Sequence, residues 1–114
     1  MNSVIDIQFP DFDTRDREER WNLMRYAGQC VKDASIKRET PFQTYLFLQH
    51  RKVLNFGEED WGREEKIKEI RIKLNIRTII YEDLGITKKM QEKIGLAIEE
   101  GREVEYRKIR QENT

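Results

Sequence analysis

The sequence predicts an α/β domain built on a parallel β-sheet. Short apolar runs rich in β-forming residues alternate with amphipathic helical segments along the whole chain. The length of 114 residues suits a single domain with one modest core. Strict alternation of strands and helices is typical of parallel sheets whose connections are right-handed crossovers.

The first half of the chain is expected to hold two strands and one helix. Residues 4–9 form the first predicted strand, which ends before a proline. The spacing of apolar residues predicts a helix from about residue 14 to residue 37, which Asp13 or Thr14 can cap. The second strand is predicted at residues 42–48, which are rich in β-branched and aromatic side chains.

The second half repeats this alternation. Helices are predicted at residues 60–74 and 87–100, and strands at 77–81 and 103–106. Gly101 is well placed to end the last helix. The residues of that helix expected to face the core are Met90, Ile94, Ala97 and Ile98.

The predicted strand order is 2-1-3-4, with helices on both faces of the sheet. The expected fold is therefore one small Rossmann-like or flavodoxin-like domain over residues 1–109, followed by a polar tail at 110–114. In such sheets, ligands bind beyond the carboxyl ends of the strands, where the strand order reverses.

Composition excludes several classes of protein. The 22 basic and 22 acidic side chains balance, which argues against general nucleic-acid binding. No apolar run approaches the roughly 20 residues that span a bilayer, and the acidic N-terminal segment is not expected to be a signal peptide. Cys30 is the only cysteine, so we expect a buried thiol, no metal site, no cofactor and a cytoplasmic location.

Two lysines mark the candidate site. Lys88 and Lys89 lie in the first turn of the predicted helix at 87–100, where the helix dipole disfavours cations. A helix N-terminus at the reversal point of the sheet binds anions, and the lysines would strengthen such a site for a phosphate. The alternative is that both lysines simply point to solvent.

Other candidates have structural alternatives. Asp11, Asp13 and Asp16 follow the first strand and can accept hydrogen bonds from ribose hydroxyls, although helix capping is favoured for Asp13 and Asp16. No glycine fingerprint for dinucleotides or P-loop phosphates accompanies them. His50, the only histidine, is interpreted as an ordinary loop residue. Trp21 and Trp61 can stack on a base, but packing is the favoured interpretation.

Several short motifs resemble small proteins related to nucleoside 2-deoxyribosyltransferases. The main match is the run YEDLGITKKM at residues 81–90, which joins a strand to a helix. Further matches are YAGQC at 26–30, the strand-like segment at 41–48, and WGR at 61–63. Their order and spacing extend the resemblance over about residues 20–108.

The resemblance implies a Rossmann-like fold, a nucleoside or nucleotide ligand, and homo-oligomers whose sites a neighbour completes. The enzymes of this family use a glutamate nucleophile on the helix that corresponds to residues 87–100. Here that position falls on Lys93, with Glu92 one residue away, and Tyr45 replaces an expected histidine. These departures affect catalysis more than binding.

Three functional hypotheses follow. The first is a non-catalytic nucleotide-binding protein, of the kind with which a phage in its host's cytoplasm could sequester a nucleotide signal of host defence. The second is an N-glycosidase or deoxyribosyltransferase with Glu92 as catalytic nucleophile. The third is a protein-interaction module that has lost its ligand. The expected ligand-binding residues are Gln8, Asp11, Tyr45, Arg63, Asp83, Gly85, Lys88 and Lys89.

Overall fold

The computed structural model of the chain describes residues 3–42 and 60–110, with residues 60–64 described by their backbone alone. Strands and helices alternate along the chain, as expected. The elements are β1 (Ser3–Gln8), α1 (Arg17–Ile36), β2 (Glu39–Pro41), α3 (Asp60–Lys73), β3 (Arg77–Tyr81), α4 (Lys88–Glu99) and β4 (Val104–Arg107).

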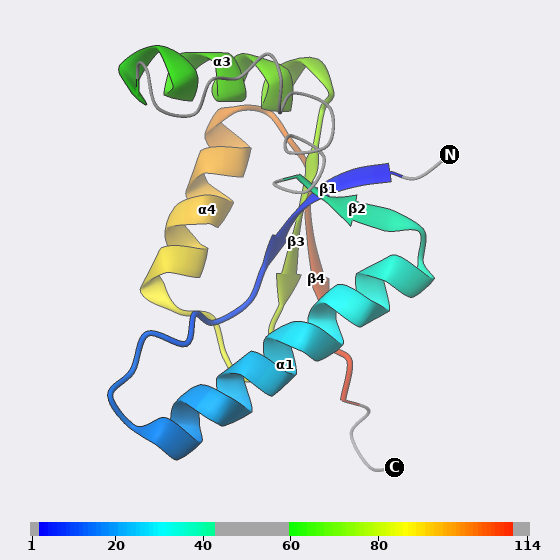
Figure 1. Cartoon of the computed structure of the whole chain (residues 1–114). Coiled ribbons are helices and arrows are strands. Elements are labelled where there is room, and N and C mark those ends of the chain that lie inside the picture. Colours follow the sequence, from blue (N-terminus) through cyan, green and yellow to red (C-terminus); the bar gives the residue numbers. More distant parts are fainter. Residues whose placement is uncertain (1–2, 43–59, 111–114) are drawn as a thin grey trace.

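All four strands are parallel and lie in the order β2-β1-β3-β4. The predicted fold class and strand order are therefore confirmed. Helix α1 packs on one face of the sheet and α4 on the other, while α3 lies across the end of the sheet at which β3 begins, next to the C-terminal end of α4 (Figure 1). This arrangement follows from right-handed crossovers, because β1 connects to β2 in one direction and the later connections run in the other.

The alternation of side chains along the strands divides the core between the two faces. Under α1, the buried cluster consists of Ile5, Ile7, Tyr26, Cys30, Ala34, Ile79 and Tyr81. The burial of Cys30 is as predicted. On the opposite face, Phe42 and Ile76 pack with residues of β1 and α3, and α4 buries Met90 and Ala97.

Helix boundaries follow capping chemistry. Asp16 caps α1, because its carboxylate accepts hydrogen bonds from the backbone N–H groups of Glu18 and Glu19. The capping role favoured for Asp16 is therefore confirmed, whereas Asp13 and Thr14 lie a few residues before the start of the helix. Gly101 ends α4 in the left-handed conformation, with φ at +71°, as expected for a glycine after a helix.

Two predictions at the level of elements were wrong. The second strand comprises Glu39–Pro41 rather than residues 42–48, and residues 43–48 lie outside the described part of the chain. Pro41 lacks an N–H group and suits this short edge strand. Ile98 is 67% exposed, because it lies on the flank of α4 rather than on the face that buries Met90 and Ala97.

A charged cluster beside α1 ties the strands together. Glu39 on β2 makes a bidentate ion pair with Arg107 on β4, with distances of 2.5 and 2.6 Å. Arg77 on β3 donates to both Glu39 and Glu105. The side chains of Glu39 and Arg107 are 5% and 11% exposed, so this pair links the two edges of the sheet largely out of solvent.

Candidate functional site

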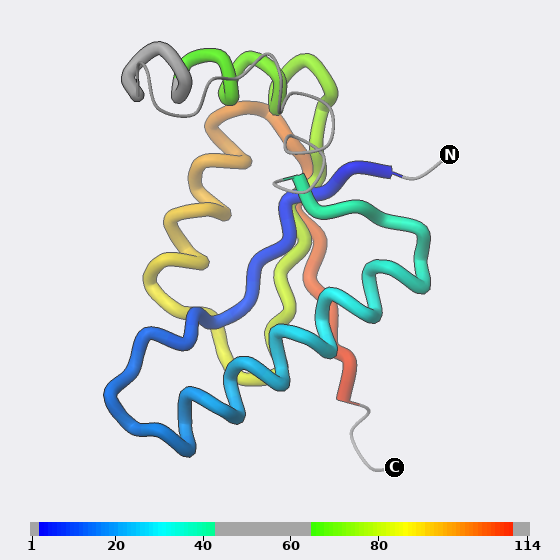
Figure 2. The backbone as a smooth tube through the Cα atoms, in the orientation of Figure 1, coloured from blue at the N-terminus to red at the C-terminus, as the bar shows by residue number. Residues whose placement is uncertain are grey.

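The candidate site lies at the carboxyl ends of β1 and β3, which are neighbours in the sheet. The chain leaves β1 towards α1 and leaves β3 towards α4, so the two loops depart towards opposite faces. The trace in Figure 2 brings the loop after β1 close to the start of α4. This is the reversal point at which open parallel sheets bind ligands.

An ion pair joins these two segments. Lys89 Nζ lies 2.9 Å from Asp11 Oδ2, although both side chains are largely exposed to solvent. The hydrogen bond from Lys89 lowers the pKa of Asp11, and the bond to Asp11 raises the pKa of Lys89. Asp13 and Glu92 add to the negative field at Lys89. Two of the predicted site residues are thus in direct contact.

The start of α4 combines a helix terminus with two cations. Thr87 caps the helix, because its hydroxyl oxygen accepts a hydrogen bond from the Met90 N–H at 3.2 Å. Before it, Gly85 adopts a φ of +95° and donates its N–H to the Glu82 carbonyl. A side chain at that φ would be strained, so the glycine is required for the turn. Lys88 and Lys89 then open the helix, both exposed.

Gln8, at the end of β1, begins a chain of polar side chains beneath α4. Its amide nitrogen donates to Asp6 at 2.7 Å, and the Thr78 hydroxyl donates to the other carboxylate oxygen of Asp6 at 3.2 Å. Arg102 then donates to Thr78 and to Glu100, which also accepts from Arg71. Sequence reasoning missed these residues, although a charge such as Asp6 within an apolar strand is a signal of buried polar contacts.

Asp83 faces away from the ion pair and towards α1. Its carboxylate accepts hydrogen bonds from the Tyr26 hydroxyl at 2.7 Å and from the backbone N–H groups of Ile109 and Arg110 at 3.0 and 2.9 Å. Burial opposes the charge, but these bonds outweigh it and hold the pKa of Asp83 below its usual value. The residue positions the loop between β3 and α4 rather than facing the mouth of the site.

The two candidates for a catalytic position lie further along α4. Glu92 is exposed, one turn beyond Lys89. Lys93 lines a groove of about 690 Å³ between α3 and α4, together with Glu65, Lys68, Arg71, Leu96 and Glu100 among others. Lys93 therefore places a cation in this groove.

Four residues considered from the sequence cannot be placed. Tyr45 and His50 lie outside the described residues, and so do the side chains of Trp61 and Arg63. The structure thus brings Gln8, Asp11, Gly85, Lys88 and Lys89 to one end of the sheet, and turns Asp83 towards α1.

Comparisons with protein-family models, curated proteins and solved structures find no match to this chain. Among the side chains that the structure describes, no group of three or more Asp, Glu, His or Cys residues is arranged to hold a metal ion. None of the helices described is long and apolar enough to cross a membrane.

Proposed function

We propose that this protein binds a nucleotide or nucleoside derivative at the carboxyl ends of β1 and β3 without turning it over. The observation that supports this proposal most directly is the contact between Asp11 and Lys89, which joins the loop after β1 to the first turn of α4. A carboxylate and two lysines then flank one helix N-terminus at the reversal point of the sheet.

The chemistry of these groups suits the two polar parts of a nucleotide. Lys88, Lys89 and the first N–H groups of α4 supply positive charge for a phosphate. A phosphate that engages Lys89 would release Asp11, whose carboxylate could then accept hydrogen bonds from ribose hydroxyls. Gly85 carries no side chain, so the backbone of the preceding turn can approach the ligand closely.

Lys93 on α4 favours binding over catalysis. Lys93 stands where the resembling enzymes carry their nucleophile, and a lysine cannot act as the carboxylate that traps a sugar. Small stand-alone proteins of the resembling kind look like phage proteins, so we propose that a homo-oligomer of this protein sequesters a nucleotide signal in the cytoplasm of a host cell.

A thermal-shift screen tests the proposal. The ligands are nucleosides, mononucleotides, cyclic nucleotides, NAD and ADP-ribose, with chromatography of each one that shifts the melting temperature. A ligand at 100 times its Kd should stabilise the fold by about 2.7 kcal/mol, which is several degrees for a domain of this size. The double variant Lys88→Ala/Lys89→Ala should weaken binding about tenfold, the loss of about 1.4 kcal/mol of charge interactions.

Lys68→Ala/Lys73→Ala is the matched control, because it removes two exposed lysines from α3, away from the first turn of α4. Binding should be unchanged in that variant. Absence of any shift across the screen would overturn the proposal. Release of free base, abolished by Glu92→Ala, would instead establish an N-glycosidase or transferase.

A further inference from the structure

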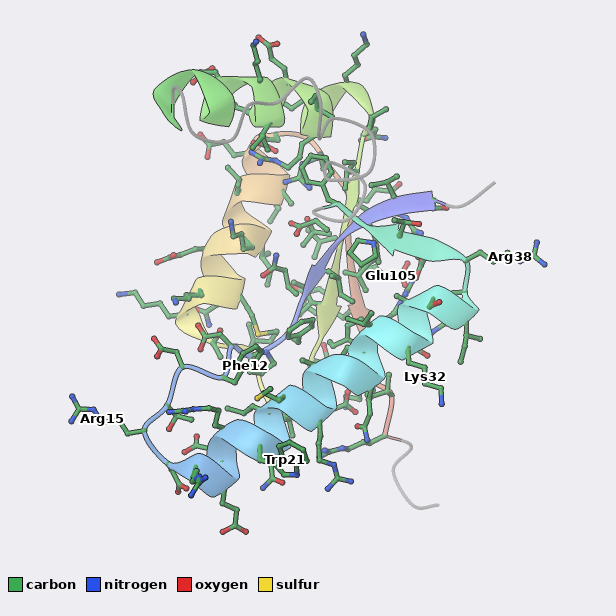
Figure 3. All side chains as sticks on the ribbon, in the orientation of Figure 1. Phe12, Arg15, Trp21, Lys32, Arg38 and Glu105 are labelled. Atoms are coloured by element: carbon green, nitrogen blue, oxygen red, sulfur yellow. The ribbon has the colours of Figure 1, made fainter. Side chains whose placement is uncertain are left out.

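Helix α1 carries a second apolar row on its outward side. Trp21, Met24 and Val31 are 61%, 44% and 40% exposed, although the helix already buries Tyr26, Ala27, Cys30 and Ala34 against the sheet. Trp21 and Lys32 project from α1 on the side away from the sheet (Figure 3). The expectation that Trp21 packs within the domain was therefore wrong.

Such a row is unusual on a chain of this composition. Charged residues make up 39% of the sequence, and a surface helix commonly has one apolar stripe, facing the core. Tryptophan is enriched in protein interfaces, where its large ring supplies much of the contact energy. The outward row on α1 therefore has the character of an interface.

The outward row has a shape that fits a second copy of itself running in the opposite direction. Trp21, Gly28 and Ser35 follow one another at intervals of seven residues, so they lie along one line on the helix. The bulky side chain stands at the N-terminal end and the small residues stand towards the C-terminal end. Gly28 is open, with no atom within 4 Å of the position of an added Cβ. An antiparallel second helix would place each Trp21 over the small residues of the other.

The charges beside the row also complement those of a second, antiparallel copy. Glu18 and Lys32 stand towards opposite ends of α1, on the same flank of the row. Within the part of the chain that the structure describes, neither side chain makes an ion pair. In an antiparallel arrangement with two-fold symmetry, Glu18 of each copy faces Lys32 of the other. The helix dipoles are then also antiparallel.

We propose that two copies of this chain associate through the outward row of α1, antiparallel and related by a two-fold axis. The partner that binds this surface is a second copy of the chain, because the shape and the charges of the row are complementary to those of an antiparallel copy. The interface uses Trp21, Met24, Gly28 and Val31, with Glu18 and Lys32 at its border. This surface is the interface of the homo-oligomer in the proposed function, but none of its residues lies in the proposed ligand site at the start of α4, so either proposal can fail without the other.

Sedimentation velocity over a concentration series tests this association. The full chain should pass from monomer to dimer, and Trp21→Ala should raise the dimer Kd about thirtyfold, as expected for an interface hot spot. Gly28→Arg should abolish the dimer. Its side chain points into open space in the monomer, so the melting temperature at low concentration should not fall.

Gly95→Arg is the control, since Gly95 is also an open glycine within an exposed helix, but on α4. The dimer should survive that change. A protein that stays monomeric up to about 1 mM would overturn the proposal, and so would a dimer that Gly28→Arg leaves intact.

Charge reversal tests the antiparallel arrangement. Glu18→Lys and Lys32→Glu should each weaken the dimer, because each places like charges opposite one another. The double variant should restore the association, since it exchanges the two charges. A double variant as weak as the sum of the two single changes would exclude the facing pair and overturn the antiparallel arrangement.

Discussion

At the scale of single residues, Asp83 has a structural role that its place in the sequence did not predict. The residue follows the carboxyl end of β3, and its binding to a ligand stays a prediction. Its carboxylate, however, accepts one hydroxyl and two backbone N–H groups from α1 and from the segment after β4. The residue connects three parts of the chain that are distant in sequence.

Replacing Asp83 by alanine should therefore cost stability more than it costs binding. The change leaves the buried Tyr26 hydroxyl and two backbone N–H groups without their acceptor, for an expected loss of about 2–4 kcal/mol. Urea denaturation measures this loss. Asp13→Ala is the control, because that exposed side chain should contribute less than about 0.5 kcal/mol. Equal stability of the two variants would show that the contacts of Asp83 are dispensable.

At the scale of elements, β2 is short and depends on contacts beyond its own ladder. Its three residues pair with β1, and Glu39 also reaches Arg107 on the far edge strand. Arg107 in turn donates to the hydroxyl of Tyr81, which donates to Asp33 on α1. An ion pair, rather than a longer run of ladder bonds, therefore holds this edge of the sheet in place.

Breaking this pair from one side should be more harmful than removing it entirely. Glu39→Gln leaves the Arg107 guanidinium, only 11% exposed, without its main counter-charge, for an expected loss of about 3 kcal/mol. In the double variant Glu39→Gln/Arg107→Met, the loss should be smaller than that of Glu39→Gln alone, because no buried charge is left unpaired. Chemical denaturation of the four proteins gives the coupling energy. A coupling near zero would mean that the pair contributes nothing to folding.

At the scale of the whole molecule, topology was predictable where local signals were strong. The strand at 77–81 was predicted with its observed bounds, because an apolar run there is flanked by polar residues. The strand at Glu39–Pro41 was not predicted, because the β-forming residues that follow it give the stronger local signal, and only pairing with β1 makes Glu39–Pro41 a strand.

The sequence predicted which residues lie at the candidate site, but not the directions of their side chains. Topology alone places Gln8, Asp11, Lys88 and Lys89 at one end of the sheet, since parallel strands all end there. The direction of Asp83 was not predictable, because it depends on Tyr26 and Ile109, which only the folded chain brings near. The exposure of Trp21 was missed for a similar reason, because helical spacing does not show which of two apolar rows meets the sheet.

The network of charges and hydroxyls also determines how stability varies with pH. Arg107 lowers the pKa of Glu39 and Arg71 lowers that of Glu100. For Asp33 and Asp83, burial raises the pKa, but hydrogen bonds led by those from Lys37 and Tyr26 respectively outweigh it. These carboxylates stabilise the fold above their unfolded pKa of about 4, and that contribution is lost as the pH falls through their lower folded values.

At alkaline pH, the stability of the fold decreases as the pH rises. Burial raises the pKa of Cys30 to about 12, and it also raises the pKa values of Tyr26 and Tyr81. Each group favours the folded state below its unfolded pKa, about 8.5 for cysteine and 10 for tyrosine, and loses that contribution as the pH rises further.

The free energy of unfolding should therefore be nearly constant between about pH 5 and 8 and fall on both sides. Urea titrations from pH 3 to pH 11 measure this profile. In Cys30→Ala, the alkaline fall should begin nearer pH 10, because only the tyrosines then remain, although the cavity left behind lowers the whole curve. A profile that rises as the pH falls below about 4 would contradict the acid limb, since the four carboxylates would then be stabilised by protonation instead of by their bonds to arginine, lysine and tyrosine.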